Sequence, residues 1–184
     1  MGIFGDSLDK ATTGTFTRPL PKSPQAQMRF LVKSTKGTRA AAERLGISQR
    51  TVERYLKGQI KQPRKDLAAR LAEEVRRRWQ PRVRERARSK AATTDGIFIE
   101  TRARFGFTAA PGTTDDARIR LITQQLPPAY AARLFDAQAA GASDQQLQDI
   151  AAEGLQEIYF KDHGRRAPGL QVQFTDIDYV EIDF

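Results

Sequence analysis

The residues with the clearest potential for chemistry lie in a short threonine-rich segment, PGTTDD at positions 111–116. Thr113 precedes Asp116 by three residues, which is the spacing of a capping box, where the threonine hydroxyl bonds to the backbone of a helix start. Thr114 would then occupy the first helical position with its hydroxyl free, and a free alcohol becomes a nucleophile when a base activates it. From the residues alone, the simpler interpretation is that Thr114 is an ordinary helix-start residue.

Other common catalytic arrangements are absent from the sequence. The chain has no cysteine and one histidine, His163, which excludes a disulfide, a cysteine nucleophile and the usual structural zinc sites. The glycine-rich phosphate loop of nucleoside triphosphatases is missing as well. Four acidic residues could hold metal ions for phosphoryl transfer, although the solvated face of a strand explains their spacing more simply: Asp176, Asp178, Glu181 and Asp183.

Residues 38–56 have the pattern of a helix-turn-helix. A first short helix is followed by Gly46, which permits a left-handed turn, and by Ser48, which caps a second helix. Small and apolar side chains recur at spacings that let the two helices pack together. They are Ala41, Ala42, Leu45, Ile47, Val52 and Tyr55.

The second helix would turn polar side chains outward, where they could reach DNA bases. Arginine pairs with guanine and glutamine with adenine in the major groove. An ordinary helical hairpin with a solvated polar face is the alternative. The residues expected to contact DNA here are Ser48, Gln49, Arg50, Arg54 and Lys57.

A further helix, expected from Pro63, ends in a cluster of basic residues before Pro81 breaks it. These residues could contact phosphate, although cations also suit the dipole of a last helical turn. The cluster consists of Arg76, Arg77 and Arg78.

Beyond Pro81, arginine occupies every second position, which is the period of a β-strand. We therefore expect a basic β-hairpin over residues 82–108, with its turn at 93–96 and a row of arginines along a phosphate track. Its second strand would turn the alternating apolar residues inward, namely Ile97, Ile99, Ala103, Phe105 and Phe107. The alternative is a continued basic helix, because Val83 and Ala87 are spaced by four. The arginines in this row are Arg82, Arg84, Arg86 and Arg88.

Together these segments predict an α+β fold in three parts. Residues 1–22 hold three glycines and two prolines and are expected to form a flexible arm, which Ile3, Phe4 and Leu8 could anchor. Residues 23–80 form the helix-turn-helix DNA-binding domain. Its first helix is expected to start at Ser23, whose hydroxyl can cap it, with Pro24 in the first turn. Residues 81–184 form a domain with the basic hairpin, two or three helices and one or two closing strands that join the hairpin in a sheet. The helices are expected around Ile119 and Ile122, from Pro128, and after Ser143.

Charge divides the chain into two contrasting halves within a net charge of +9. Residues 29–104 carry 22 basic and 8 acidic side chains, whereas residues 105–184 carry 6 basic and 12 acidic ones. The basic half favours nucleic acid as a partner, and the acidic half is better suited to another protein. No stretch approaches the roughly 18 apolar residues of a membrane span, so we expect a cytoplasmic protein.

The sequence resembles the telomere-protecting terminal proteins of linear actinobacterial chromosomes and plasmids. The resemblance covers essentially the full length. It rests on the start MGIFGDSLDKA, on the string AAAERLGISQRTVERYLKG and on the segment RARFGFTAAPGTTDDARIRLITQQLPPAYAARLFDAQ.

The resemblance implies that one copy stays attached to each 5′ end of the DNA. It assigns to Thr114 the hydroxyl that accepts the first deoxynucleotide, a deoxycytidylate, and so primes synthesis that fills the 3′ overhang. The chain would then be a protein primer without an intrinsic cofactor, because the Mg²⁺ and the deoxynucleotide are bound by a DNA polymerase acting in trans.

The implied partners are telomeric DNA, as 3′ overhang and duplex, a telomere-associated protein and the polymerase, at chromosome ends in the nucleoid. Two alternatives remain at this point. One is a helix-turn-helix transcriptional regulator that binds DNA reversibly. The other is a nucleotidyltransferase that uses Asp176 and Asp178.

Overall fold

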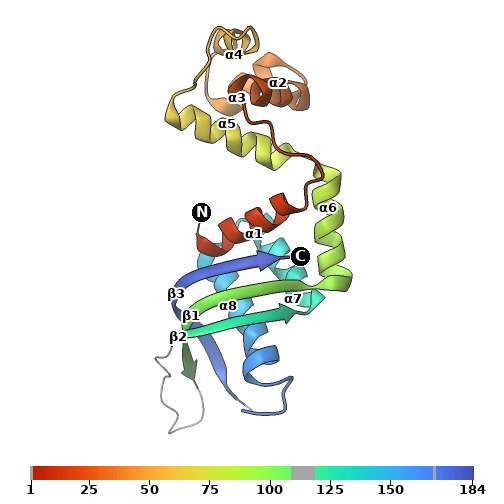
Figure 1. Ribbon diagram of the computed structural model, residues 1–184, viewed down its shortest axis with the longest axis vertical. Coiled ribbons are helices and arrows are strands. Elements are labelled where there is room, and N and C mark those ends of the chain that lie inside the picture. Colours follow the sequence, from red (N-terminus) through yellow and green to blue (C-terminus); the bar gives the residue numbers. More distant parts are fainter. Residues whose placement is uncertain (1, 109–118, 168) are drawn as a thin grey trace. The chain divides into compact units, whose positions relative to one another are not determined.

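The computed structural model describes residues 2–108, 119–167 and 169–184. Across these ranges the fold is α+β, with eight α-helices and one three-stranded antiparallel sheet. The chain divides into two units (Figure 1): a helical unit, Phe16–Arg82, and a sheet unit, Met1–Thr15 with Val83–Phe184. None of the helices in the described ranges has the length and apolar character needed to cross a membrane.

The helical unit consists of four helices around one apolar core. They are α2 (Pro24–Thr35), α3 (Thr38–Leu45), α4 (Gln49–Leu56) and α5 (Lys65–Arg78). The expected start of α2 is confirmed: Ser23 caps it by accepting a hydrogen bond from the Ala26 amide, with Pro24 in the first turn. The fully buried core side chains are Met28, Leu31, Ala41, Leu45, Val52 and Leu71.

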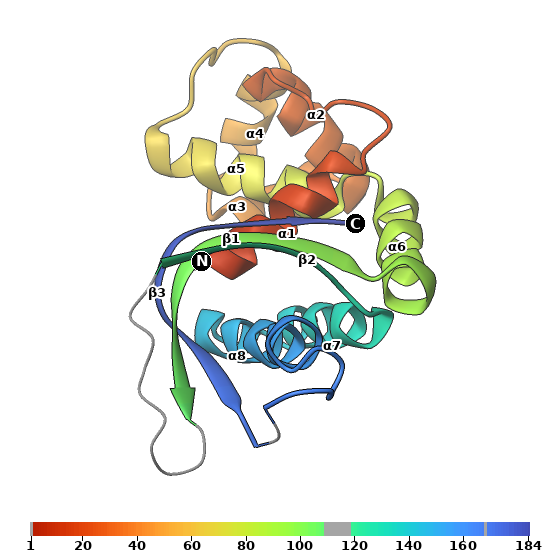
Figure 2. The ribbon, with the colours of Figure 1, turned by 60° about the horizontal axis from the view of Figure 1, so that its bottom comes forward.

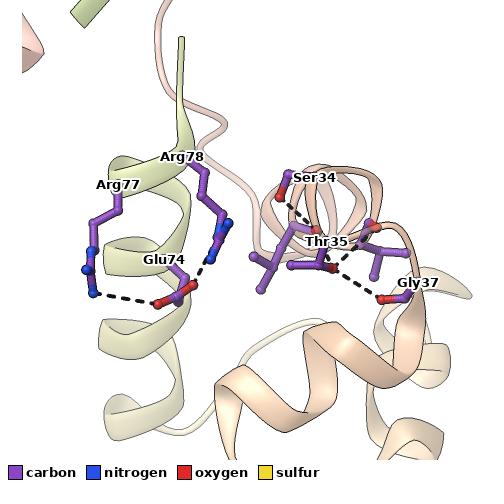
Figure 3. Close-up of polar contacts among 8 residues, drawn as sticks. Ser34, Thr35, Gly37, Glu74, Arg77 and Arg78 are labelled. Atoms are coloured by element: carbon purple, nitrogen blue, oxygen red, sulfur yellow. Dashed lines mark hydrogen bonds and ion pairs between the residues drawn. The ribbon is translucent and has the colours of Figure 1, made fainter. Parts of the chain in front are cut away.

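The end of α2 fixes the direction of the chain into α3. Lys36 adopts a left-handed backbone with φ 60°, and the Gly37 amide donates a 3.0 Å hydrogen bond back to the Val32 carbonyl. The Thr35 hydroxyl lies within hydrogen-bond distance of the Leu31 and Gly37 carbonyls, at 2.9 and 3.2 Å (Figure 3). The bond from the Gly37 amide satisfies the Val32 carbonyl, which the end of α2 leaves without a partner inside the helix.

The sheet unit has strand order β2-β1-β3, with β1 at Ile97–Thr108, β2 at Ile119–Leu126 and β3 at Gln171–Asp183. Helices α7 (Pro128–Ala139) and α8 (Asp144–Leu155) lie together against one face of the sheet (Figure 2). The sheet unit also contains two short π-helices, η1 (Ala91–Asp95) and η2 (Gln156–Phe160). The core between the sheet and helices α7 and α8 is made of buried apolar side chains from both. They include Ile97, Ile99, Phe105, Ile122 and Leu126 of the strands and Leu134 and Leu155 of the helices.

Several expectations for this unit are confirmed. Pro128 opens α7, and Ser143 caps α8 in a capping box with Gln146. The alternating apolar side chains of β1 face the core, and the C-terminal strand β3 pairs with β1 along its length.

One expected helix is a strand. Ile119 and Ile122 belong to β2, which pairs with β1 so that Ile122 lies opposite Thr101. The buried residues of β2 are Ile122 and Leu126, whose spacing of four also fits one face of a helix. The spacing of the apolar residues therefore could not distinguish a helix from a strand. Hydrogen-bonded pairing with β1 makes this segment a strand.

The expected N-terminal arm is an ordered helix, α1 (Ile3–Gly14). Phe4 and Leu8 are fully buried in the sheet unit, one helical turn apart. Gly2 offers no side-chain cap, but Asp144 at the start of α8 accepts 3.0 Å hydrogen bonds from the amides of Phe4 and Gly5. The prediction of a flexible arm was wrong because this tertiary cap and burial compensate for weak local helix signals.

The expected basic hairpin is also wrong. Residues Pro81–Lys90 form helix α6, and the true partners of β1 are β2 and β3. Proline is accommodated in the first turn of a helix, where its missing amide is not needed, so Pro81 starts a helix instead of ending helical structure. The break before it lies at Gln80, which adopts φ 44°.

Candidate nucleic-acid interface

Helix α4 is held in the helical unit by its buried side. Val52 and Tyr55 are 0% and 2% exposed, and burial raises the pKa of the Tyr55 phenol above its ordinary value. The Gln25 side chain of α2 donates a 3.0 Å hydrogen bond to the Leu56 carbonyl at the end of α4. The orientation of the remaining side of α4 is therefore fixed by packing.

The connection between α3 and α4 is short and specific. Gly46 ends α3 with φ 61°, a left-handed conformation that side chains disfavour. Ser48 then caps α4, with its hydroxyl oxygen 3.2 Å from the Thr51 amide that donates to it. Both features match the turn expected from the sequence.

The outward side of α4 carries the expected polar residues around a shallow hollow of about 600 Å³. Gln49 donates a 3.0 Å hydrogen bond to Glu53, so its amide is already oriented. Arg50, Arg54 and Lys57 are exposed, and no side chain in the described part of the protein pairs with them. The lining residues are Gln49, Arg50, Glu53, Arg54, Lys57 and Gln59.

Three cations against one carboxylate make this hollow suitable for phosphate or for the acceptor edges of bases. The sequence reasoning missed Gln59 because it lies just beyond α4. Glu53, on the same side of α4, accepts the hydrogen bond that holds the Gln49 side chain.

The three arginines at the end of α5 are partly engaged by acids of the same helix. Arg76 pairs with Glu73 at 2.6 Å, and Glu74 lies between Arg77 and Arg78, at 4.0 and 3.1 Å (Figure 3). The Arg77 side chain is the most exposed of the three, at 69%. The cluster is therefore weaker as a phosphate site than its sequence indicates, and Arg77 is its most accessible member.

The four alternating arginines do not share one face, because the segment is helical. Arg82 and Arg86 are exposed, whereas Arg84 and Arg88 are half-buried. In a helix, residues four apart share a side and residues two apart do not. The expected arginine row is thus divided into two pairs, and only the exposed pair is available to a ligand.

Arg88 is part of the sheet unit's packing. Its guanidinium donates a 2.6 Å hydrogen bond to Gln138 of α7 and approaches the Thr12 hydroxyl of α1 at 3.4 Å. It also lies over the Phe135 ring, 5.1 Å from the centroid. Burial, followed by the nearby charge of Arg84, lowers the Arg88 pKa. Arg88 therefore joins three helices, and its guanidinium is engaged in packing within the sheet unit.

The candidate priming residue, Thr114, lies outside the described residues, as does Thr113. Both belong to the connection from Thr108, at the end of β1, to Ile119, at the start of β2.

The acidic residues of β3 lie on the outward face of the sheet. Asp178 pairs with Arg102 at 3.3 Å and Asp176 with Arg104 at 4.0 Å. Within the described ranges, no group of three acidic or histidine side chains could hold a metal ion. The geometry of Asp176 and Asp178 is that of cross-strand ion pairs.

The charge contrast follows the division into units. The helical unit contains 18 basic and 5 acidic residues, and the sheet unit contains 13 basic and 17 acidic ones. The positive potential that attracts polyanions therefore originates in the helical unit.

Comparison of the chain with protein-family models, with curated proteins and with solved structures finds no match.

Proposed function

We propose that this chain is a terminal protein of a linear replicon, which binds DNA through its helical unit and carries the 5′ end of the DNA on Thr114. The observation that carries the DNA-binding part is the exposed face of α4, where Arg50, Arg54 and Lys57 have no partner within the described residues. The priming role rests on the resemblance of the sequence to actinobacterial terminal proteins.

In this proposal α3 and α4 act as a helix-turn-helix, with α4 as the recognition helix. Gln49 and Arg50 at its N-terminal end read base edges in the major groove, as this motif does elsewhere. Arg54, Lys57 and the exposed Arg77 and Arg82 of the helical unit contact phosphate and give affinity that depends on salt. Arg86 is left out because it belongs to the sheet unit. Arg84 and Arg88 are omitted because they are half-buried.

The proposed reaction joins the Thr114 oxygen to a nucleotide. The side-chain oxygen attacks the α-phosphorus of deoxycytidine triphosphate, an ester bond to phosphate forms, and pyrophosphate leaves. A polymerase binds the Mg²⁺ ions and accepts the hydroxyl proton. The attached nucleotide keeps a free 3′-hydroxyl, which the polymerase then extends across the overhang.

This role requires two protein partners besides DNA: the polymerase and a telomere-associated protein that binds the 3′ overhang. It also places the protein at chromosome ends in the nucleoid. Both statements are implied by the resemblance.

A labelling experiment tests the proposal. The full chain is incubated with α-³²P-labelled deoxycytidine triphosphate, Mg²⁺, a telomeric template and an extract that supplies polymerase and partners. We expect label that survives denaturation on the wild type, none on Thr114→Val, and reduced label on Thr114→Ser.

Thr113→Val is the matched control, because it removes a neighbouring hydroxyl of the same type; it is expected to keep the label. Equal labelling of Thr114→Val and wild type would refute the priming role. DNA binding without any label in the wild type would instead favour the reversible regulator.

A further inference from the structure

The outward face of the sheet has an ordered arrangement of side chains near the start of β1. In the strand register Phe98 lies between Gln125 of β2 and Asp183 of β3. Two residues along, Glu100 lies between Thr123 and Glu181. Residues two apart on one strand lie on the same face, about 7 Å from each other. Side chains of directly paired residues on neighbouring strands are closer, about 5 Å apart.

Phe98 places an exposed aromatic ring on this face. It is 49% accessible, whereas the preceding residue, Ile97, points to the opposite face and is buried in the core. Two hollows of about 420 and 430 Å³ are both lined by Phe98 and by Asp183. The ring therefore separates two depressions instead of filling one.

Four side-chain carboxylates in the described ranges border these hollows, and only two of them pair with a lysine. Lys10 pairs with Glu181, and Lys90 with Asp95, each at 2.7 Å. Glu100 and Asp183 have no basic partner within the described residues.

The hydrogen bonds of these two carboxylates leave their charge in place. Glu100 accepts a 2.8 Å hydrogen bond from the Tyr179 hydroxyl, which raises the pKa of that phenol. Asp183 accepts one from the Phe184 amide at 2.9 Å. Farther along β1, Arg102 and Arg104 are paired with acids of β3, so uncompensated negative charge is concentrated at the Phe98 end.

We propose that the surface formed by Phe98, Glu100 and Asp183 binds an arginine or lysine side chain on a segment of a partner protein. A cation over an aromatic ring is attracted by the ring's quadrupole. Carboxylates beside the ring add charge-assisted hydrogen bonds and select a cationic partner over neutral ones. The hollows on both sides of Phe98 leave room for the flanking residues of such a segment.

The same charge excludes nucleic acid as the occupant, because phosphate is repelled by Glu100 and Asp183. Protein binding at this surface is thus chemically separate from DNA binding by α4. The inference goes beyond the proposed priming role and does not depend on it.

The test uses the full ¹⁵N-labelled chain and two synthetic peptides, acetyl-Gly-Arg-Gly-Arg-Gly-amide and its glutamate counterpart. We expect the arginine peptide to produce saturable amide shifts at Phe98, Glu100 and Asp183, and the glutamate peptide to produce none. Phe98→Leu should weaken binding about fivefold, because leucine keeps apolar area but lacks the ring quadrupole. Glu100→Gln and Asp183→Asn should each weaken binding about threefold, and Lys10→Gln should strengthen it, since a competing cation is removed.

Asp136→Asn is the matched control. Asp136 is an exposed carboxylate on α7, outside this surface, and its loss should leave the affinity unchanged. Equal weakening by Asp136→Asn and Asp183→Asn would overturn the proposal, because the attraction would then be diffuse. Absence of saturable shifts, or equal binding of both peptides, would overturn it as well. So would a dimer, observed by sedimentation, that Phe98→Leu dissociates, since a second copy would then occupy the surface.

Discussion

The guanidinium of Arg88 stacks on Phe135 at 5.1 Å and donates a 2.6 Å hydrogen bond to Gln138. Gln138 in turn donates to Asp9 of α1 at 3.2 Å. Arginine at this position therefore connects α6 with α7 and α1, while Arg86, two residues earlier, is exposed. The two residues look equivalent in an alternating sequence and have different roles in the helix.

This difference predicts opposite effects of two alanine substitutions on stability. Arg88→Ala should lower the free energy of unfolding by about 2 kcal/mol. It removes a half-buried hydrogen bond from a charged donor, and it leaves the side-chain oxygen of Gln138 without that donor. Arg86→Ala should change it by less than about 0.5 kcal/mol. Urea unfolding measures both, and similar values for the two variants would contradict the assignment of Arg88 to packing.

The proposed DNA interface predicts two distinct binding defects. Arg50→Ala should reduce the preference for the specific sequence, because Arg50 is assigned to base contacts. Arg82→Ala should weaken binding to all sequences and reduce the slope of log affinity against log salt by about 1. Binding is measured by fluorescence anisotropy at several salt concentrations. An unchanged slope for Arg82→Ala would remove that residue from the phosphate contacts.

Gly96 is predicted to tolerate no side chain. Its φ is 72°, and a β-carbon there would collide with the Leu126 carbonyl oxygen of β2. Gly96→Ala should cost about 2 kcal/mol or more of unfolding free energy. Gly141 is the control, since it has a similar φ of 79° with open space around it, so Gly141→Ala should cost only the backbone strain of about 1 kcal/mol. Equal costs would show that the contact with Leu126 does not matter.

The pair Arg133–Glu153 predicts a small pH-dependent contribution to stability. The hydrogen bond from Arg133 lowers the pKa of Glu153 below its ordinary value of 4.5. A lowered carboxyl pKa stabilises the fold above that ordinary value, and the contribution is lost as the pH falls through the lowered pKa. Both side chains are about half exposed, so the contribution should be only about 0.5 kcal/mol. The unfolding free energies of wild type and Glu153→Gln should thus differ more at pH 7 than at pH 3, and a difference that grows toward pH 3 would contradict the sign.

Local signals in the sequence predicted the helical unit well. Ser23, Pro24, Gly46 and Ser48 act through their own backbone conformation and caps, so their effect does not depend on distant residues. The same holds for Ser143 and its capping box. The α4 face followed directly, because Val52 and Tyr55 define which side is buried.

The sheet unit was harder to predict because its structure depends on contacts between distant segments. Helix α1 is capped by Asp144, and β2 becomes a strand through pairing with β1; no local pattern contains either partner. In α6 the alternation of arginines suggested a strand, but the spacing of Val83 and Ala87 was the informative period. The strand period places Phe98 on the face opposite to Ile97 and Ile99, but the hollows beside it are lined by residues from α1, β2 and β3 and could not be identified beforehand.

The most direct measurement for the central claim is the mass of the peptide that carries the nucleotide. Protein labelled in the priming reaction is digested with nuclease and protease, and the modified residue is located by fragmentation mass spectrometry. The account predicts one deoxycytidylate ester on the side-chain oxygen of Thr114. An adduct on any other residue, or the absence of an adduct from protein attached to DNA ends, would contradict it.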